Sequence, residues 1–256
     1  QQKYQAFTEL LERVNYAISY EEFLESVKTQ AQSMSKLSLF SDVDSFSEKN
    51  IQKTAEAYEK MNAVQPGLTY SDAADAWSNS ALADVIVPGL LLFLGWAIFR
   101  KEKETGLYQL LGSTKRGHLE MALAKTIVYF FFAVLLAILL YGSQIVLAIL
   151  MYGTGDMTLA LISIPSFRNC PYSISIQQYL ILYLAVKVLA ALFYASVIMA
   201  MLTRRWRFGI AASACVVVIC LEYLAYKQIN SVSKWNSLKY LNLVAVIDAK
   251  AWFCEY

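Results

Sequence analysis

Long runs of hydrophobic residues, separated by short polar segments, dominate the chain after residue 80. A helix needs about 20 mostly apolar residues to cross roughly 30 Å of hydrocarbon. Four segments meet this requirement: 81–99, 122–152, 176–202 and 208–227. They predict an all-α, polytopic membrane protein whose transmembrane domain occupies residues 81–227.

The first 80 residues follow a different pattern, in which apolar positions recur every three or four residues between charged ones. This spacing is typical of amphipathic helices and predicts one helix over 3–38 and a second over about 46–62. Near Ser19 and Tyr20 the apolar positions change phase, which predicts a kink or a break. We therefore expect residues 1–80 to form a small helical domain.

Two features between residues 122 and 175 bear on how the chain crosses a membrane. Residues 126–152 are 27 residues without a charge, about 40 Å of helix. A helix of that length must tilt, bend near Gly142 or project beyond the membrane. Residues 153–175 carry glycines and prolines, which indicate a loop instead of a span.

Charge is scarce and unevenly distributed. Charged residues make up 16% of the chain, against 57% hydrophobic residues, whereas soluble domains carry about 25% charge. Residues 1–80 hold 7 Lys and Arg against 12 Asp and Glu, although the whole chain has a net charge of +2. No basic patch is interleaved with aromatic residues, which argues against a nucleic-acid partner.

Positive residues mark the cytoplasmic loops of membrane proteins and so predict an orientation. The segment 100–118 carries five of them and 203–207 three, whereas 153–175 carries only Arg168. We expect 100–118 and 203–207 to face the cytoplasm. Residues 1–80, the 153–175 loop and residues 228–256 then lie outside.

An outer domain ahead of the first visible span needs an earlier span to deliver it. We therefore expect one further span before Gln1 and one after Tyr256, which gives six spans in the complete protein. The segment 228–256 is expected to precede the last of them.

Several kinds of catalytic and ligand-binding chemistry are absent from the sequence. It has no G-x-x-x-x-G-K-[ST] string for nucleotide phosphates. It has a single histidine, His118, so neither a histidine-based metal site nor a catalytic triad is expected. We expect no enzyme activity and no cofactor in this chain. Cys170 and Cys254 are both expected outside, where the question of a disulfide between them stays open.

Four charged residues lie within the apolar segments. A lysine at the bilayer centre costs about 2.5–3.5 kcal/mol on insertion scales, so Lys187 is expected to face other helices or a cavity. It marks either a substrate path or inter-span ion pair, or a purely structural pair, or it snorkels from a displaced span. Asp84, Lys125 and Glu222 lie nearer the ends of their segments and are expected to act as interfacial anchors.

The polar segment between the first two spans, "EKETGLYQLLGSTKRG" at 102–117, is patterned. A helix beginning near residue 101 places Leu107, Leu110 and Leu111 on one face. Such a short amphipathic helix rests on a lipid surface or inserts into a groove on a soluble partner.

The string "EKETGLYQLLGSTKRGHLEMALAK" resembles the segment after the second span of ABC-2-type transporter permeases. The shared features are an acid, a glycine, a leucine-rich turn, a serine-containing turn with a base, and a later lysine. They correspond to Glu104, Gly106, Leu110-Leu111, Ser113-Thr114, Arg116 and Lys125. The string is also similar to E-x-G-L-x-x-x-L-G-[AS] of the mechanotransmission-type export permeases, which likewise carry outer domains.

The resemblance implies a permease subunit of a bacterial ATP-binding cassette exporter in the cell membrane. Its partners would be a cytoplasmic ATPase subunit that holds ATP and Mg, and a second permease subunit. The resemblance assigns coupling to the ATPase to seven residues: Glu104, Gly106, Leu107, Leu110, Leu111, Lys115 and Arg116. Two functions of different classes stay open beside it: a membrane sensor or immunity protein that binds a ligand through its outer domain, and a structural assembly subunit.

Overall fold

The structure is a computed structural model. The described residues are 2–38, 52–53, 56–64, 66–68, 73, 81–99, 117–203 and 208–228. Within them the fold is all-helical and has no β-strand, apart from an isolated bridge between Ala160 and Ser175. The described elements are α1 (Gln2–Ser38), η1 (Lys60–Ala63), α4 (Ala81–Phe99), α7 (Gly117–Tyr152), η2 (Leu161–Ser163), η3 (Pro165–Phe167), α8 (Ile176–Thr203) and α9 (Phe208–Gln228).

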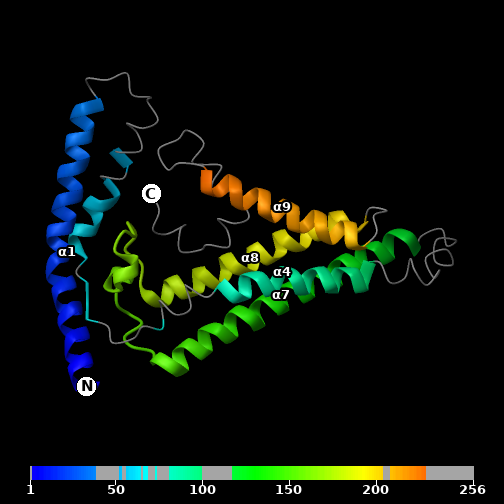
Figure 1. Cartoon of the computed structure of the whole chain (residues 1–256), viewed down its shortest axis with the longest axis horizontal. Helices are drawn as coiled ribbons and strands as arrows, with labels where there is room; N and C mark the ends of the chain where they lie inside the picture. The colour runs from blue at the N-terminus through cyan, green and yellow to red at the C-terminus, as the bar shows by residue number, and fades with distance from the viewer. Residues whose placement is uncertain are drawn as a thin grey trace.

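The helices are arranged in two parts. α4, α7 and α8 pack against one another, and α9 packs against α8. Figure 1 shows α1 crosswise to this bundle, at the end where α8 begins and α7 finishes. We call α1, the described residues of 56–68 and residues 153–175 the cap.

The centre of the bundle is built largely from small residues and tyrosines. We call this cluster the bundle core; its buried members are Ala83, Val87, Leu91, Tyr129, Ala133, Ala137, Tyr141, Ala191, Tyr194, Ala195, Ile198, Leu202 and Cys215. Alanines four residues apart on α7 and on α8 let the helix backbones approach closely, as in membrane helix bundles.

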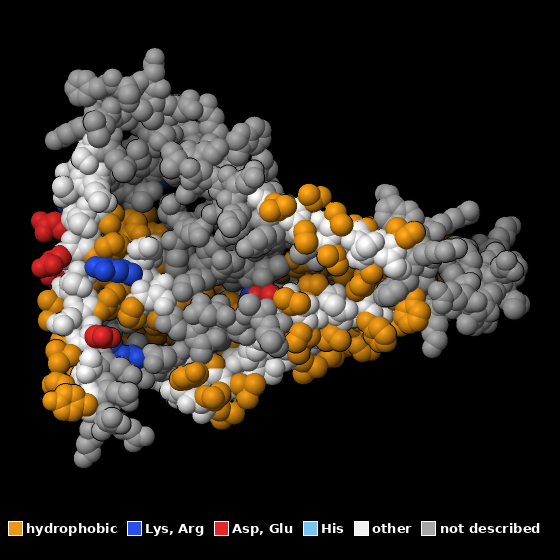
Figure 2. Space-filling model, viewed as in Figure 1, with side chains coloured by type: hydrophobic (Ala, Val, Ile, Leu, Met, Phe, Trp, Pro, Cys, Tyr) orange, Lys and Arg blue, Asp and Glu red, His pale blue; other side chains and the backbone are white. Residues whose placement is uncertain are grey.

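The outward faces of the bundle helices are apolar as well. On α7, Phe131 is 62% exposed and Leu139 is 62% exposed, and Phe193 on α8 is 51% exposed. Figure 2 shows hydrophobic side chains along the bundle on the face in view. Two described stretches, Leu119–Tyr152 and Ile176–Thr203, are long and apolar enough to cross a membrane by length and composition. Ala83–Phe99 is a shorter apolar helix.

A second core joins the cap to the ends of α7 and α8. We call it the cap core; its buried members are Tyr20, Leu24, Met61, Ala73, Ile145, Ala148, Leu161, Ile162, Ile164, Phe167, Cys170, Ile176, Tyr179 and Tyr183. The 153–175 segment supplies several of these residues. It is a loop, as the sequence predicts, and it contains two short 3-10 turns, η2 and η3.

α7 has 36 residues, which corresponds to about 54 Å at 1.5 Å per residue. The helix continues through Gly142, and Ile145 and Ala148 beyond it lie in the cap core. The last turns of α7 therefore belong to the cap, so the bundle and the cap share one uninterrupted helix.

The change of phase in α1 has a packing explanation. α1 is a single helix over Gln2–Ser38, so of the predicted kink or break the break is wrong, and the kink stays a prediction. Tyr4 and Phe7, in the first half, are exposed, whereas Tyr20 and Leu24 are buried in the cap core. The two apolar sets face different surroundings, which does not require the backbone to break.

Candidate functional site

Several of the residues singled out from the sequence cannot be compared with the structure. The seven coupling candidates, Cys254 and the side chain of Glu222 lie outside the described residues. Cys170 is fully buried in the cap core. The coupling role and the disulfide stay predictions.

The structure brings two of the four charged residues together. The Nζ atom of Lys187 in α8 lies 2.7 Å from Oδ1 of Asp84 in the first turn of α4. The side chain of Lys187 is 3% exposed and that of Asp84 is 17% exposed. The two groups form a buried ion pair between residues 103 positions apart in sequence.

Tyr141 of α7 completes this arrangement. Its hydroxyl donates a hydrogen bond of 2.9 Å to the same Oδ1 atom of Asp84. The ammonium group of Lys187 lies 5.1 Å from the ring centroid of Tyr141 and 5.4 Å from that of Tyr183. We call Asp84, Lys187 and Tyr141 the polar centre; it joins α4, α7 and α8 at one point.

The polar centre lies where the two cores meet. Tyr141 belongs to the bundle core and Tyr183 to the cap core. Removing two charges from water costs several kcal/mol per ion, which the attraction between them repays only with good geometry and further hydrogen bonds. The bond from Tyr141 and the two ring faces supply such additional contacts.

Pairing with Asp84 also defines the depth of Lys187 in the bundle. Lys187 is near the middle of α8 in sequence, but its partner is in the first turn of α4, the helix that stays within the bundle. α8 extends about 11 residues further, roughly 16 Å, toward the cap. Lys187 thus lies at one end of the part shared by all three helices.

Lys125 lies away from this centre. It is half-exposed in α7, one residue before Thr126, whose hydroxyl approaches Met199 Sδ at 3.8 Å. That contact is near the end of α8 that is remote from the cap. Lys125 and Tyr141 are 16 residues apart on α7, which corresponds to about 24 Å of helix, so Lys125 does not belong to the polar centre.

Arg168 fastens the 153–175 loop to α1. One Nη atom donates a hydrogen bond of 3.3 Å to the carbonyl of Ser19, and the guanidinium lies 4.3 Å from the ring centroid of Phe23. The Tyr16 hydroxyl donates in turn to the carbonyl of Ile162 at 2.7 Å. The sequence marks Arg168 only as the lone base of its loop.

Ionisation of Tyr16 is expected to lower the stability of the cap at alkaline pH. Burial raises the pKa of Tyr16 from 10.0 to about 12, an effect that nearby Arg168 partly opposes. A group whose pKa is higher in the folded state stabilises the fold below its unfolded pKa and loses that effect as pH rises through the folded pKa. We expect the cap to loosen between pH 10 and about 12.

The measurement is tyrosinate absorbance followed together with protease resistance of the cap. Tyr16→Phe removes one hydrogen bond, which typically contributes about 1 kcal/mol, so the cap should be weaker at neutral pH. The loss across the alkaline range should also be shallower than in the parent chain. An identical alkaline profile would exclude Tyr16 as the group responsible.

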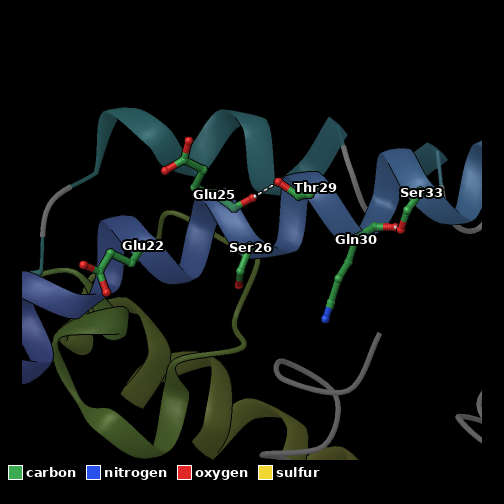
Figure 3. A pocket seen from close by; sticks show the side chains of 6 residues that line it. All are labelled: Glu22, Glu25, Ser26, Thr29, Gln30 and Ser33. Atoms are coloured by element: carbon green, nitrogen blue, oxygen red, sulfur yellow. Dashed lines mark hydrogen bonds between the residues drawn. The ribbon is translucent and has the colours of Figure 1, made fainter.

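Two surface grooves border α1. One, of about 440 Å³, is lined by Glu22, Glu25, Ser26, Thr29, Gln30 and Ser33. Figure 3 shows that these side chains all come from α1, and the hydroxyls of Ser26, Thr29 and Ser33 bond to carbonyls of the same helix. The hydroxyls are thus engaged locally, which makes this groove a solvated helix face.

The second groove is apolar and lies between α1 and residues 64–68. It has a volume of about 380 Å³, and its apolar lining includes Val14, Ile18, Pro66 and Leu68. It is the groove whose lining comes from two separate parts of the cap.

The sequence allows Lys187 to form an ion pair between spans, but it does not identify the partners that the structure shows, Asp84 and Tyr141. The sequence predicts Asp84 as an interfacial anchor and does not single out Tyr141. The available signal is that the four charged residues singled out from the sequence, two acids and two bases, lie in four different apolar segments, which allows ion pairs but does not state which acid meets which base. Among the described residues, no group of His, Cys, Asp and Glu is arranged to hold a metal ion.

Comparison with known proteins gives no relative: no family model matches the chain, and neither a curated protein nor a solved structure matches it.

Proposed function

We propose that this chain is the permease subunit of an ATP-driven exporter and is coupled to a separate ATPase subunit through residues 100–118. The proposal rests on the distribution of basic segments between the two ends of the bundle. α4 ends at Phe99 beside Tyr129, with ring centroids 5.4 Å apart, and α8 ends one residue after buried Leu202. Both junctions therefore leave the bundle at the end remote from the cap.

These junctions carry most of the positive charge of the bundle. Segments 100–118 and 203–207 contain eight Lys and Arg between them, and the 153–175 loop at the cap end contains Arg168 alone. An apolar outer surface lies between the two ends. Large exposed apolar patches mark membrane or protein contacts, and the basic end is the cytoplasmic one in membrane proteins. This arrangement supports a multi-pass orientation with the cap outside.

A cytoplasmic segment with a leucine stripe fits the need of a permease that has no nucleotide-binding string. ATP hydrolysis would occur in a partner, and the stripe at Leu107, Leu110 and Leu111 would insert into a groove of that partner. The charged neighbours Glu104, Lys115 and Arg116 would border the contact. A second permease subunit would complete the transporter.

The test is affinity purification of the tagged chain from membranes, with co-purifying ATP hydrolysis and transport as readouts. Leu110→Asp with Leu111→Asp places two charges in the stripe and should abolish the associated ATPase activity. Leu10→Asp with Leu11→Asp is a matched control, because these adjacent leucines of α1 are 41% and 44% exposed. If the 110/111 variant retains both ATPase association and transport, the coupling proposal is wrong.

One observation favours the mechanotransmission type of export permease as the second candidate. α7 and α8 run without interruption from the bundle core into the cap core. A change in helix packing at the cytoplasmic end would therefore move the cap directly. In that case, a cross-link that prevents the cap from moving should stop export, whereas the ATPase should still associate with the chain.

The apolar groove between α1 and residues 64–68 favours a third candidate, a membrane sensor that binds a ligand outside. A sensor of this kind needs no ATPase. Ile18→Asp places a charge in the lining of this groove. Loss of the biological response in this variant, together with normal behaviour of the Leu110/Leu111 variant, would favour the sensor.

A further inference from the structure

The start of α4 is built as a segment that is weakly joined to the rest of its helix. Pro88 lies inside α4, one turn after Asp84. Proline has no N–H group, so the carbonyl of Asp84 lacks the donor that it would have in a regular helix. Gly89 follows directly, and a Cβ atom placed there would meet no heavy atom within 4 Å. Residues 81–87 therefore precede a local weak point, which we call the α4 hinge (Pro88-Gly89).

The described residues ahead of the hinge pack in the bundle core and make one ion pair. Ala83 and Val87 lie in the bundle core, and Asp84 makes the ion pair to Lys187. α7 and α8 contribute to both cores, whereas the described residues of α4 contribute to the bundle core only. The ion pair to Lys187, together with the hydrogen bond from Tyr141, thus holds the first turn of α4 at the boundary between the cores.

This first turn is also close to the cap along the chain. Ala73, which is 1% exposed in the cap core, precedes α4 by eight positions. Along the chain, seven residues separate this member of the cap core from the start of α4.

From these observations we propose that Asp84 and Lys187 form a latch on the α4 hinge. With the pair formed, residues 81–87 are closed against α8. When the pair separates, residues 81–87 rotate about Pro88-Gly89, and the bundle opens at the boundary between the bundle core and the cap core. The inference concerns the conformation of this chain and does not depend on the proposed ATPase partner.

The surroundings of Lys187 make release reversible. The rings of Tyr141 and Tyr183 lie within 5.5 Å of the ammonium group, close enough for cation–π attraction. These ring faces stay on α7 and α8 when α4 moves. Their attraction for the ammonium group offsets part of the attraction that is lost when the Asp84 carboxylate moves away. The Tyr141 hydroxyl provides a dipole at the position that the carboxylate leaves.

The experiment measures opening by thiol reactivity in the full-length chain in lipid nanodiscs. Ala83→Cys is the reporter, because Ala83 lies ahead of the hinge and is 3% exposed. Ala133→Cys is the matched control; Ala133 is a fully buried alanine of the same core, on α7. Labelling with a small water-soluble thiol reagent is compared with the chain lacking either new cysteine, which gives the background of native thiols.

Asp84→Asn should raise the labelling rate at position 83 by roughly tenfold or more, since removal of one partner of a buried pair is strongly destabilising. Labelling at position 133 should stay within about twofold, since that site lies outside the hinged turn. Adding Pro88→Ala restores the missing backbone donor and should return the rate at 83 toward that of the parent. A purely structural pair would instead raise labelling at both positions, and Pro88→Ala would not reverse it.

Pro88→Ala with the native pair gives an answer even if Asp84→Asn fails to fold. It should slow labelling at position 83 below the parent rate, because the hinge is stiffened while the pair is intact. An unchanged or higher rate in this variant would overturn the hinge. Parallel ATPase measurements distinguish this result from failure of the proposed function, because the labelling readout requires no ATP.

Discussion

Replacing Asp84 with leucine is expected to lower the free energy of unfolding by about 3–5 kcal/mol, the range for breaking a buried ion pair on one side. The loss comes mainly from Lys187. That side chain is 3% exposed and would retain a charge without its carboxylate partner. Reversible unfolding in mixed detergent micelles measures the effect.

The reciprocal variant should have a smaller effect. In Lys187→Met the remaining group is Asp84, which is 17% exposed and still accepts the hydrogen bond from Tyr141. The double variant Asp84→Leu with Lys187→Met should be more stable than either single one, because well-packed apolar residues often replace a buried ion pair at little cost.

Lys125→Met provides the control for loss of a lysine from the same bundle. Lys125 is half-exposed in α7 and lies far from the polar centre, so we expect a change below about 1 kcal/mol. If the stability loss of the double variant equalled the sum of the losses in the Asp84 and Lys187 single variants, the two residues would be independent, which would contradict the ion pair.

Replacing Gly95 with leucine is expected to cost about 2–3 kcal/mol, the upper part of the usual range for overpacked cores. A Cβ atom at Gly95 would lie 2.8 Å from Cδ1 of Leu202 and 3.2 Å from the hydroxyl oxygen of Tyr129. Leu202 is 2% exposed and Tyr129 is fully buried, so neither can move aside freely. α4 must then separate from α7 and α8.

The separation has a second consequence that can be measured. The Tyr129 hydroxyl donates a hydrogen bond of 3.1 Å to the carbonyl of Leu91, one turn before Gly95. We expect Gly95→Leu to break this bond and to change the ultraviolet spectrum of Tyr129, in addition to lowering stability.

Gly142→Leu is the matched control, because Gly142 also lies inside a long helix but a Cβ atom there meets nothing within 4 Å. Leucine has a higher helix propensity than glycine by roughly 0.5–1 kcal/mol, so this variant should be neutral or more stable. Equal losses at positions 95 and 142 would show that helix packing is not the cause.

The two variants in the bundle test different properties of the same helix contact. Gly95 controls how closely α4 approaches its neighbours, whereas Asp84 controls the position of the first turn. Together with the apolar outer surface, they describe a bundle whose interior holds a charged pair and closely packed helices, while apolar side chains are exposed on its outside. This distribution supports the proposed membrane setting, where apolar packing between helices has no advantage over contact with lipid.

The sequence by itself determined where the long described helices lie; the predicted helix over about 46–62 falls partly outside the described residues. The predicted segments 81–99, 122–152, 176–202 and 208–227 all coincide with helices, and the long helix in the first 38 residues is present. Local composition decides such elements, because each helix satisfies its own backbone hydrogen bonds. The glycines and prolines of residues 153–175 likewise predicted a loop there.

Only the tertiary structure decided which charged groups meet. Asp84 and Lys187 are 103 positions apart, and no local pattern states which face of α4 turns toward α8. The same holds for Arg168, whose partners Ser19 and Phe23 belong to another helix. Hydrophobic periodicity specifies a helix and its apolar faces. The pairing of polar side chains depends on the register and rotation of packed helices, which are fixed by contacts between distant parts of the chain.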